Sequence, residues 1–163
     1  MNKKIVIVNE KDEIIGNKLR NEIKSKDVYR VSALWITNSK KEILLAQRAF
    51  TKKNDPGKWT TAVAGTIEEG ESYDSNIIKE AKEELRLYNI KPQKGQKIRV
   101  YGEHNFFCQW YTLVLDKPLE YFVFSKEEVR SIKWFTPKAL AKEVEKNPDN
   151  FLPSMKQWID LFC

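Results

Sequence analysis

The stretch GTIEEGESYDSNIIKEAKEELRL, from Gly65 to Leu87, decides how this chain folds. Its second half predicts an α-helix on which Glu80, Glu83 and Glu84 stand at positions i, i+3 and i+4, so the three carboxylates share one face. The opposite stripe is apolar, and we expect it to pack the helix onto the domain: Ile77, Ile78, Ala81 and Leu85. Like charges this close repel, whereas a hard divalent cation would coordinate them. The stretch therefore predicts a metal-binding helix.

This stretch resembles the signature of the Nudix hydrolases, Gly-x5-Glu-x7-Arg-Glu-apolar-x-Glu-Glu-x-Gly-apolar. The matching positions are Gly65, Glu71, Glu80, Ala81, Glu83, Glu84 and Leu87. Lys79 replaces the arginine, which keeps the charge but loses the planar fork that can bind a carboxylate through two hydrogen bonds. Arg86 replaces the glycine that ends the helix in the left-handed conformation, so we expect the helix to continue through Tyr88.

A helix rich in Lys and Glu is often only a solvated face, and 32% of this chain is charged. Two further residues, Gly65 and Glu71, stand at fixed offsets before the helix and follow an apolar, β-like run. The full motif therefore favours a catalytic interpretation of the acids.

Length and composition indicate one domain over residues 1–163, with the Nudix box at 65–87. A chain of 163 residues can bury one good core, and 41% hydrophobic residues are typical of a globular protein. We expect no membrane association, because no apolar run is long enough for a span and the apolar start is too short for a signal peptide. With two cysteines, Cys108 and Cys163, no disulfide framework is predicted, so a cytoplasmic location is expected.

The net charge of +6 does not by itself indicate a nucleic-acid partner. Nucleic-acid binding normally needs basic residues on one face, and here the lysines are spread along the chain. A solubilising surface is the favoured interpretation. A basic surround would also attract a polyphosphate substrate.

The order of expected elements indicates an α/β fold. We expect strands at 4–9, 13–15, 31–37, 42–47, 59–67, 98–107, 109–115 and 132–135, the first two forming an N-terminal β-hairpin. The box helix is expected to begin after Ser72 as its N-cap, a second helix to span 137–146 with Pro137 in its first turn, and a third to begin at Pro153. The resemblance implies that these elements form the Nudix α/β/α sandwich with a mixed central sheet.

Three segments outside the box resemble the isopentenyl-diphosphate-isomerase-like branch: 20–23, 59–65 and 147–153. The resemblance implies a cysteine just before the box glycine, a histidine after it and a metal site with several histidines. This chain has Ala64 and Thr66 at those two positions, and its one histidine is His104. Alanine cannot transfer a proton to an alkene, so we expect hydrolysis rather than isomerisation.

The resemblance also implies the metal site and the catalytic acids. We expect Mg²⁺ or Mn²⁺ at Glu80 and Glu84, with Glu83 and the Gly65 carbonyl as further ligands, where the ions neutralise phosphate charge and activate a water. The general base is left open between a box glutamate, Glu80 or Glu83, and an acid on a later loop. Glu128, beside Glu127, is the candidate there, and two solvated loop glutamates are an equal alternative.

Substrate-binding candidates are fewer and less distinctive. Arg48 and Lys58 are candidate phosphate clamps, although basic loop residues are common. His104 is a candidate pocket residue, with a hydrogen-bonded structural histidine as the alternative.

Three functions are compatible with these residues. The first is hydrolysis of a diphosphate linkage in a small, nucleotide-derived molecule; the others are an isopentenyl-diphosphate-type isomerase and a non-catalytic nucleotide-sensing module. The oligomeric state is open, with a homodimer as one option.

Overall fold

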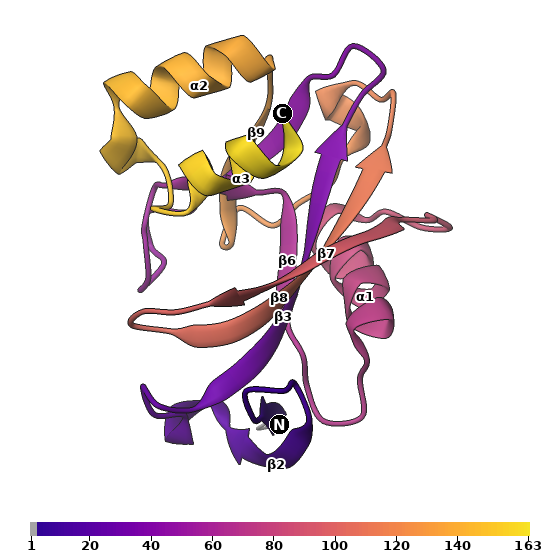
Figure 1. Cartoon of the computed structure of the whole chain (residues 1–163). Helices are drawn as coiled ribbons and strands as arrows, with labels where there is room; N and C mark the ends of the chain where they lie inside the picture. Colours follow the sequence, from indigo (N-terminus) through magenta and orange to yellow (C-terminus); the bar gives the residue numbers. More distant parts are fainter. Residues whose placement is uncertain (1–2) are drawn as a thin grey trace. The chain divides into compact units, whose positions relative to one another are not determined.

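The computed structural model describes residues 3–163, and within these it has nine β-strands in one sheet and three α-helices (Figure 1). The strands are β1 (Lys4–Val8), β2 (Ile14–Leu19), β3 (Val28–Thr37), β4 (Ile43–Arg48), β5 (Trp59–Thr61), β6 (Val63–Thr66), β7 (Gln93–Val100), β8 (Asn105–Val114) and β9 (Val129–Phe135). The helices are α1 (Tyr73–Leu85), α2 (Pro137–Lys146) and α3 (Met155–Phe162), with 3-10 turns at Arg20–Glu22, Leu119–Tyr121 and Pro148–Asn150. The predicted α/β class is confirmed.

These residues form two compact units that alternate along the sequence. The first unit contains residues 3–34, 63–83 and 87–112, and the second contains 35–62, 84–86 and 113–163. The assignment of residues 1–163 to a single domain stays a prediction.

In the first unit, the predicted N-terminal hairpin is confirmed. Strands β1 and β2 pair antiparallel, with Ile5 opposite Lys18. The turn is closed by a hydrogen bond from the Asn9 N–H to the Glu13 carbonyl at 2.9 Å, and the Asn9 side-chain oxygen accepts from two backbone N–H groups in the same turn. Strand β3 pairs antiparallel with β1 and with β6, and it also pairs with β8.

Helix α1 buries most of the predicted apolar stripe. Ile77, Ala81 and Leu85 are each no more than 1% exposed, and they recur every four residues along one face. Ile78 is 43% exposed, so its assignment to the stripe was wrong. One residue advances the helix by about 100°, which turns Ile78 away from the row that Ile77 begins.

Both ends of α1 have a local cause. The Ser72 hydroxyl accepts a hydrogen bond from the Ser75 N–H at 3.0 Å, which confirms Ser72 as the N-cap. The expected continuation through Tyr88 was wrong, because α1 ends at Leu85 and Arg86 adopts a left-handed φ of 55°. The turn lets Leu87 become buried and donate to the Ala81 carbonyl at 3.2 Å. Arginine thus takes the conformation that the signature glycine provides.

In the second unit, β4 lies between β9 and β5, with Ile43 opposite Phe135 and Leu45 opposite Thr61. Helices α2 and α3 lie side by side (Figure 1). The predicted start of α2 is confirmed, since the Thr136 hydroxyl accepts from the Ala139 N–H and Pro137 is in the first turn. The predicted mixed sheet is also confirmed, and Trp59 of β5 additionally forms an isolated parallel bridge with Phe151.

Several expected boundaries were wrong: β2, β3, β7 and β9 extend beyond the ranges expected for them, and three segments are assigned differently. The segment 59–67 forms two strands, since β5 pairs with β4 whereas β6 pairs with β3. The strand expected at 98–107 ends at Val100, and residues 101–104 form a turn, so Phe106 and Phe107 belong to β8. The third helix begins at Met155 rather than Pro153. Within residues 3–163, no helix is long and apolar enough to cross a membrane.

Candidate active site

The side chain of Glu80 lies directly against the backbone of Gly65. A Cβ atom added at residue 65 would lie 2.4 Å from Glu80 Cγ and 2.7 Å from its Oε1 oxygen. The approach is possible because residue 65 has no side chain, and it places a carboxylate that is 15% exposed beside the end of β6. Carboxylate oxygens are the ligands that a hard divalent cation prefers, so a carboxylate held at this position has the chemistry of a metal ligand.

Lys79 connects the acids around this cradle. Its Nζ lies 2.5 Å from Glu71 Oε1, 3.5 Å from Glu80 Oε1 and 3.7 Å from Glu68 Oε1. Burial acts to lower the pKa of Lys79, but its hydrogen bond to Glu71 and the charges of Glu80, Glu71 and Glu68 raise it above its ordinary value. The lysine therefore stays protonated and keeps the positive charge that the signature arginine supplies.

Glu71 is held through both carboxylate oxygens. Oε1 accepts from Lys79, whereas Oε2 accepts from the Glu68 N–H at 2.9 Å and from the Asn76 amide at 2.8 Å. Burial acts to raise the pKa of Glu71, but these hydrogen bonds and the charge of Lys79 hold it below its ordinary value. Glu71 is thus ionised and fixed at the start of the box helix.

The other two box acids follow Glu80 on α1. Glu83 is exposed and Glu84 is half-buried, and the helix places them one turn after Glu80. Within residues 3–163, no three His, Cys, Asp or Glu side chains already converge as a closed metal site. The donors with the right chemistry for a hard cation are the box carboxylates and the Gly65 carbonyl.

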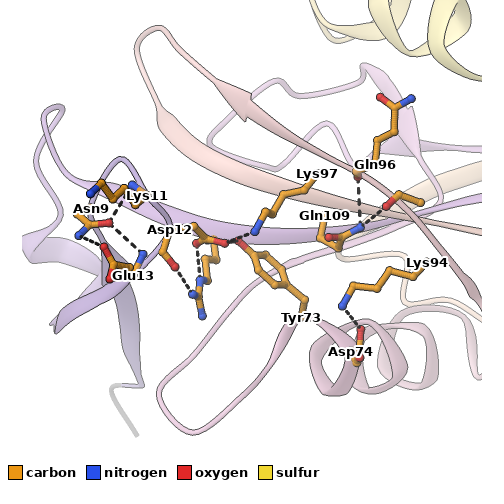
Figure 2. A network of polar contacts seen from close by, with 12 residues as sticks. Asn9, Lys11, Asp12, Glu13, Tyr73, Asp74, Lys94, Gln96, Lys97 and Gln109 are labelled. Carbon is orange, nitrogen blue, oxygen red and sulfur yellow. Dashed lines mark hydrogen bonds and ion pairs between the residues drawn. The ribbon is translucent and has the colours of Figure 1, made fainter.

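A second polar network fixes the first residue of α1, as Figure 2 shows. The Tyr73 hydroxyl donates to Asp12 at 2.9 Å, and Arg30 and Lys97 each approach the same carboxylate at 2.7 Å. The Asp12 side chain is only 7% exposed. Burial acts to raise the pKa of Asp12, and its hydrogen bonds from Lys97, Arg30 and Tyr73 hold it below its ordinary value. This network joins the β1–β2 turn, β3 and β7 to the start of the box helix.

The two positions that would carry isomerase chemistry lie on β6. Ala64 pairs with Ala33 across the sheet, and its methyl group carries no transferable proton. Thr66 pairs with Val31, and its carbonyl accepts a hydrogen bond from the Asn76 amide at 3.3 Å. Neither position offers an acid or a base.

The predicted phosphate clamps, Arg48 and Lys58, lie in the second unit at the two ends of one loop. The Arg48 N–H donates to the Lys58 carbonyl at 2.9 Å. The Arg48 guanidinium also donates to the Asn54 carbonyl at 2.9 Å, and Lys58 Nζ lies 3.9 Å from Asp55. The two cations are thus close in the fold, and both already have loop partners. Their role in substrate binding stays a prediction.

Glu128 is also in the second unit, where its side chain is 64% exposed and lies 2.5 Å from Lys52 Nζ. Glu127 beside it is exposed. An open pocket of about 570 Å³ lies nearby and is lined by Ala49, Phe50, Thr51, Lys126, Arg130 and Ser131. The Arg130 guanidinium lies 4.7 Å from the centre of the Phe50 ring. The catalytic role of Glu128 stays a prediction.

His104 is exposed in the turn between β7 and β8. The substrate-binding role assigned to it stays a prediction, as does its structural alternative.

Several residues of these networks were not predicted from the sequence, among them Asn76, Asp12 and Ser32, whose hydroxyl donates to the Asn76 side-chain oxygen. The position of Asn76 on the buried face of an amphipathic helix could have predicted a hydrogen-bond network, since a buried amide needs partners. Nothing local marks Ser32 or Asp12, whose partners are distant in sequence.

Comparisons with known proteins identify the family. A family model described as the NUDIX domain matches residues 26–155, which is more than half of the chain, so the chain belongs to the Nudix family. It is a pyrophosphohydrolase of that family. A crystal structure from Deinococcus radiodurans has a TM-score of 0.84 at 20% identity and covers 98% of this chain and 99% of its own, which shows the shared fold.

Two curated relatives match over most of their length. An isopentenyl-diphosphate Delta-isomerase from Aliivibrio fischeri is 25% identical, over 93% of this chain and 90% of its own. A prenyl-diphosphate phosphatase from Methanosarcina mazei is 27% identical, over 91% of this chain and 88% of its own. The predicted resemblance to the isomerase-like branch of the family is confirmed.

Proposed function

We propose that this chain hydrolyses a diphosphate linkage in a nucleoside diphosphate derivative, using Mg²⁺ or Mn²⁺. The single observation that carries the proposal is the approach of Glu80 to Gly65, which places a carboxylate of α1 against the backbone near the end of β6. Nudix hydrolases use divalent metals, and the acids of the signature are all present. We assign the cation to Glu80, Glu83, Glu84 and the Gly65 carbonyl.

The chain's own residues would contribute orientation and proton transfer. A bound cation supplies Lewis-acid stabilisation of phosphate charge. Glu71 holds Lys79 at 2.5 Å, so the ammonium lies closer to Glu71 than to Glu80, with which it forms a longer ion pair at 3.5 Å. Of the three candidate bases, Glu83 is exposed on α1, Glu80 packs on Gly65, and Glu128 is paired with Lys52. We therefore assign the general base to Glu83.

A prenyl diphosphate is a second candidate substrate. The Methanosarcina mazei relative is named a prenyl-diphosphate phosphatase, and it aligns with 91% of this chain. The same acids would serve either substrate, because the reacting diphosphate is common to both.

Isomerisation is disfavoured although isomerases are among the relatives. Ala64 stands where a proton-transferring thiol would be needed. We expect no deuterium to enter isopentenyl diphosphate when the chain is incubated with it and Mg²⁺ in heavy water. Incorporation at enzyme-like rates would overturn hydrolysis as the proposed reaction.

The test is a substrate panel with matched variants. The purified chain is incubated with nucleoside diphosphate derivatives and with prenyl diphosphates, with Mg²⁺, Mn²⁺ or EDTA, and products are identified by phosphate release and mass spectrometry. We expect metal-dependent cleavage in one of the two classes and its loss in Glu80→Gln. If wild type binds nucleotides but cleaves nothing, the nucleotide-sensing alternative is the better description.

A further inference from the structure

Asn76 is a buried amide in the first turn of α1. It is 0% exposed, on the face of α1 that packs against the first unit. Its Nδ2 donates to Glu71 Oε2 at 2.8 Å and to the Thr66 carbonyl at 3.3 Å. Its Oδ1 accepts from the hydroxyl of Ser32, a residue on β3 that is also 0% exposed. Because the Glu71 carboxylate and the Thr66 carbonyl can only accept, they require Nδ2 on their side, and Oδ1 then accepts from the Ser32 hydroxyl.

Asn76 and Lys79 bind different oxygens of the Glu71 carboxylate, so Asn76 fixes the oxygen that Lys79 does not contact. An ammonium group acts as a point charge, and Lys79 contacts Oε1 of Glu71 at 2.5 Å. A guanidinium fork can bind both carboxylate oxygens at once, which a single ammonium does not match. Here Oε2 is held instead by Asn76 and by the Glu68 N–H.

The position of Glu71 in turn decides where Lys79 lies. With Glu71 fixed, Lys79 Nζ is 2.5 Å from Glu71 and 3.5 Å from Glu80. If Glu71 were released, the ammonium could move fully onto Glu80. A cation and an ammonium group would then compete for the same carboxylate.

We infer that Ser32 and Asn76 are positioning residues that hold Glu71, and that Glu71 thereby keeps Lys79 from closing on Glu80. The inference rests on the proposed function insofar as Glu80 binds the catalytic cation. The hold on Glu71 is a property of the folded chain itself. In this chain, the buried Ser–Asn pair supplies the second hydrogen bond that the signature arginine could make.

A purely structural role makes a different prediction. Any buried amide with satisfied hydrogen bonds contributes to stability, and its loss lowers stability wherever it lies. Gln109 is the matched control, since it is 4% exposed in the same unit and donates to the carbonyl of Gln96 (Figure 2). It also donates to the carbonyls of Gly95 and Trp110. The acceptors of these bonds are all backbone atoms of β7 and β8, and none of the bonds involves a box acid.

The experiment measures Mn²⁺ affinity by electron paramagnetic resonance of free Mn²⁺. Full-length Asn76→Ala, Ser32→Ala and Gln109→Ala are each prepared with and without Lys79→Arg. We expect Asn76→Ala to weaken Mn²⁺ binding about tenfold, and Ser32→Ala about threefold, in the range of one hydrogen bond to a charged group. Lys79→Arg should restore both to within about twofold, because the guanidinium can bind both oxygens of Glu71. Gln109→Ala should leave the affinity unchanged in either background.

Crystal structures of Asn76→Ala and Ser32→Ala give a readout that needs no metal. We expect Lys79 Nζ within about 3 Å of Glu80 in at least one of them, the distance of a direct ion pair. Equal losses of affinity with and without Lys79→Arg, or an equal loss in Gln109→Ala, would overturn the inference. An unmoved Lys79 in both crystal structures would overturn it as well.

The experiments distinguish failure of the proposed function from failure of the inference about Ser32 and Asn76. If wild type binds Mn²⁺ but cleaves no diphosphate, hydrolysis fails while the affinity pattern still tests the positioning residues. If wild type does not bind Mn²⁺, the proposed metal site fails, and the position of Lys79 in the two crystal structures decides the inference.

Discussion

The carboxylate of Glu80 occupies the space beside Gly65 that any other residue would need for its side chain. A Cβ atom there would lie 2.5 Å from the Glu80 carboxyl carbon, closer than real Cβ contacts come. The glycine and the glutamate of the signature are therefore coupled by direct contact. This contact places the Glu80 carboxylate against the backbone of the residue whose carbonyl is the other proposed ligand of a hard cation.

Gly65→Ala tests this contact. We expect Glu80 to be displaced and Mn²⁺ affinity and turnover to fall about tenfold or more, the equivalent of one lost charge-assisted interaction. Gly16→Ala is the control, since a Cβ at that position meets no atom within 4 Å. Titration calorimetry with Mn²⁺ and phosphate release measure the two effects, and equal behaviour of the two variants would contradict the coupling.

Lys79→Arg should raise turnover modestly, whereas Glu83→Gln should nearly abolish it. Lys79 already contacts Glu71 Oε1 at 2.5 Å and Asn76 already donates to Oε2, so a guanidinium should change kcat by no more than a few-fold. Loss of a general base costs about 10²–10⁴ in rate. Steady-state kinetics at pH 8 distinguish the two; a fully active Glu83→Gln would remove Glu83 from the base role.

Arg86→Gly should stabilise the protein by about 1 kcal/mol. Arg86 has a φ of 55°, a conformation that costs an L-residue energy and that glycine adopts freely. Arg86→Ala is the control, because it removes the same side chain but keeps the strained conformation. Urea denaturation measures the free energy of unfolding, and no difference between the two variants would show that the left-handed turn carries no strain.

Asp12→Asn should lower stability at pH 7 by about 2 kcal/mol, the scale of a lost charge-assisted pair. Asp12 receives Arg30 and Lys97, each at 2.7 Å, and the amide leaves both cations without their counter-charge. The pKa of Asp12 lies below its ordinary value of 3.8, so its stabilisation is present above that pH and is lost as pH falls through the lowered pKa.

The pH dependence gives the check on Asp12. We expect the difference in unfolding free energy between wild type and Asp12→Asn to be largest near neutral pH and to shrink below about pH 4. Denaturant titrations from pH 3 to pH 7 measure it. A difference that stays constant over this range would mean that the charge of Asp12 does not contribute.

Cys108 should resist alkylation in the native protein. The thiol is 5% exposed, and burial raises its pKa to about 12, so it stays protonated at pH 8. Iodoacetamide at pH 8 should therefore modify Cys163 alone, and Cys108 only after unfolding in guanidinium. Mass spectrometry of tryptic peptides measures this, and native modification of Cys108 would show that this strand opens readily.

Local sequence was sufficient wherever a short-range rule applied. The β1–β2 hairpin, the Ser72 cap of α1 and the Thr136–Pro137 start of α2 follow from turn and capping chemistry within a few residues. The sequence also marked the box acids, because a helix repeats every 3.6 residues.

Predictions from local sequence were wrong where tertiary contacts outweighed the local conformational preference of a segment. Arg86 was expected to extend α1, but burial of Leu87 requires the chain to turn there, and the arginine takes the left-handed conformation. Segment 59–67 was expected to form one strand, but its two halves pair with different neighbours.

The sequence by itself determined the family, the α/β class and which acids are predicted to hold a cation, since these depend on residue type and spacing along the chain. Only the tertiary structure decided how the acids are held. Three sets of contacts are involved. Gly65 on β6 contacts Glu80 on α1, Lys79 is paired with both Glu71 and Glu80, and Asn76 on α1 is buried against Ser32 on β3. The physical reason is that hydrogen bonds and ion pairs act over a few ångströms in space, and sequence spacing reports such distances only within a single helix, strand or turn.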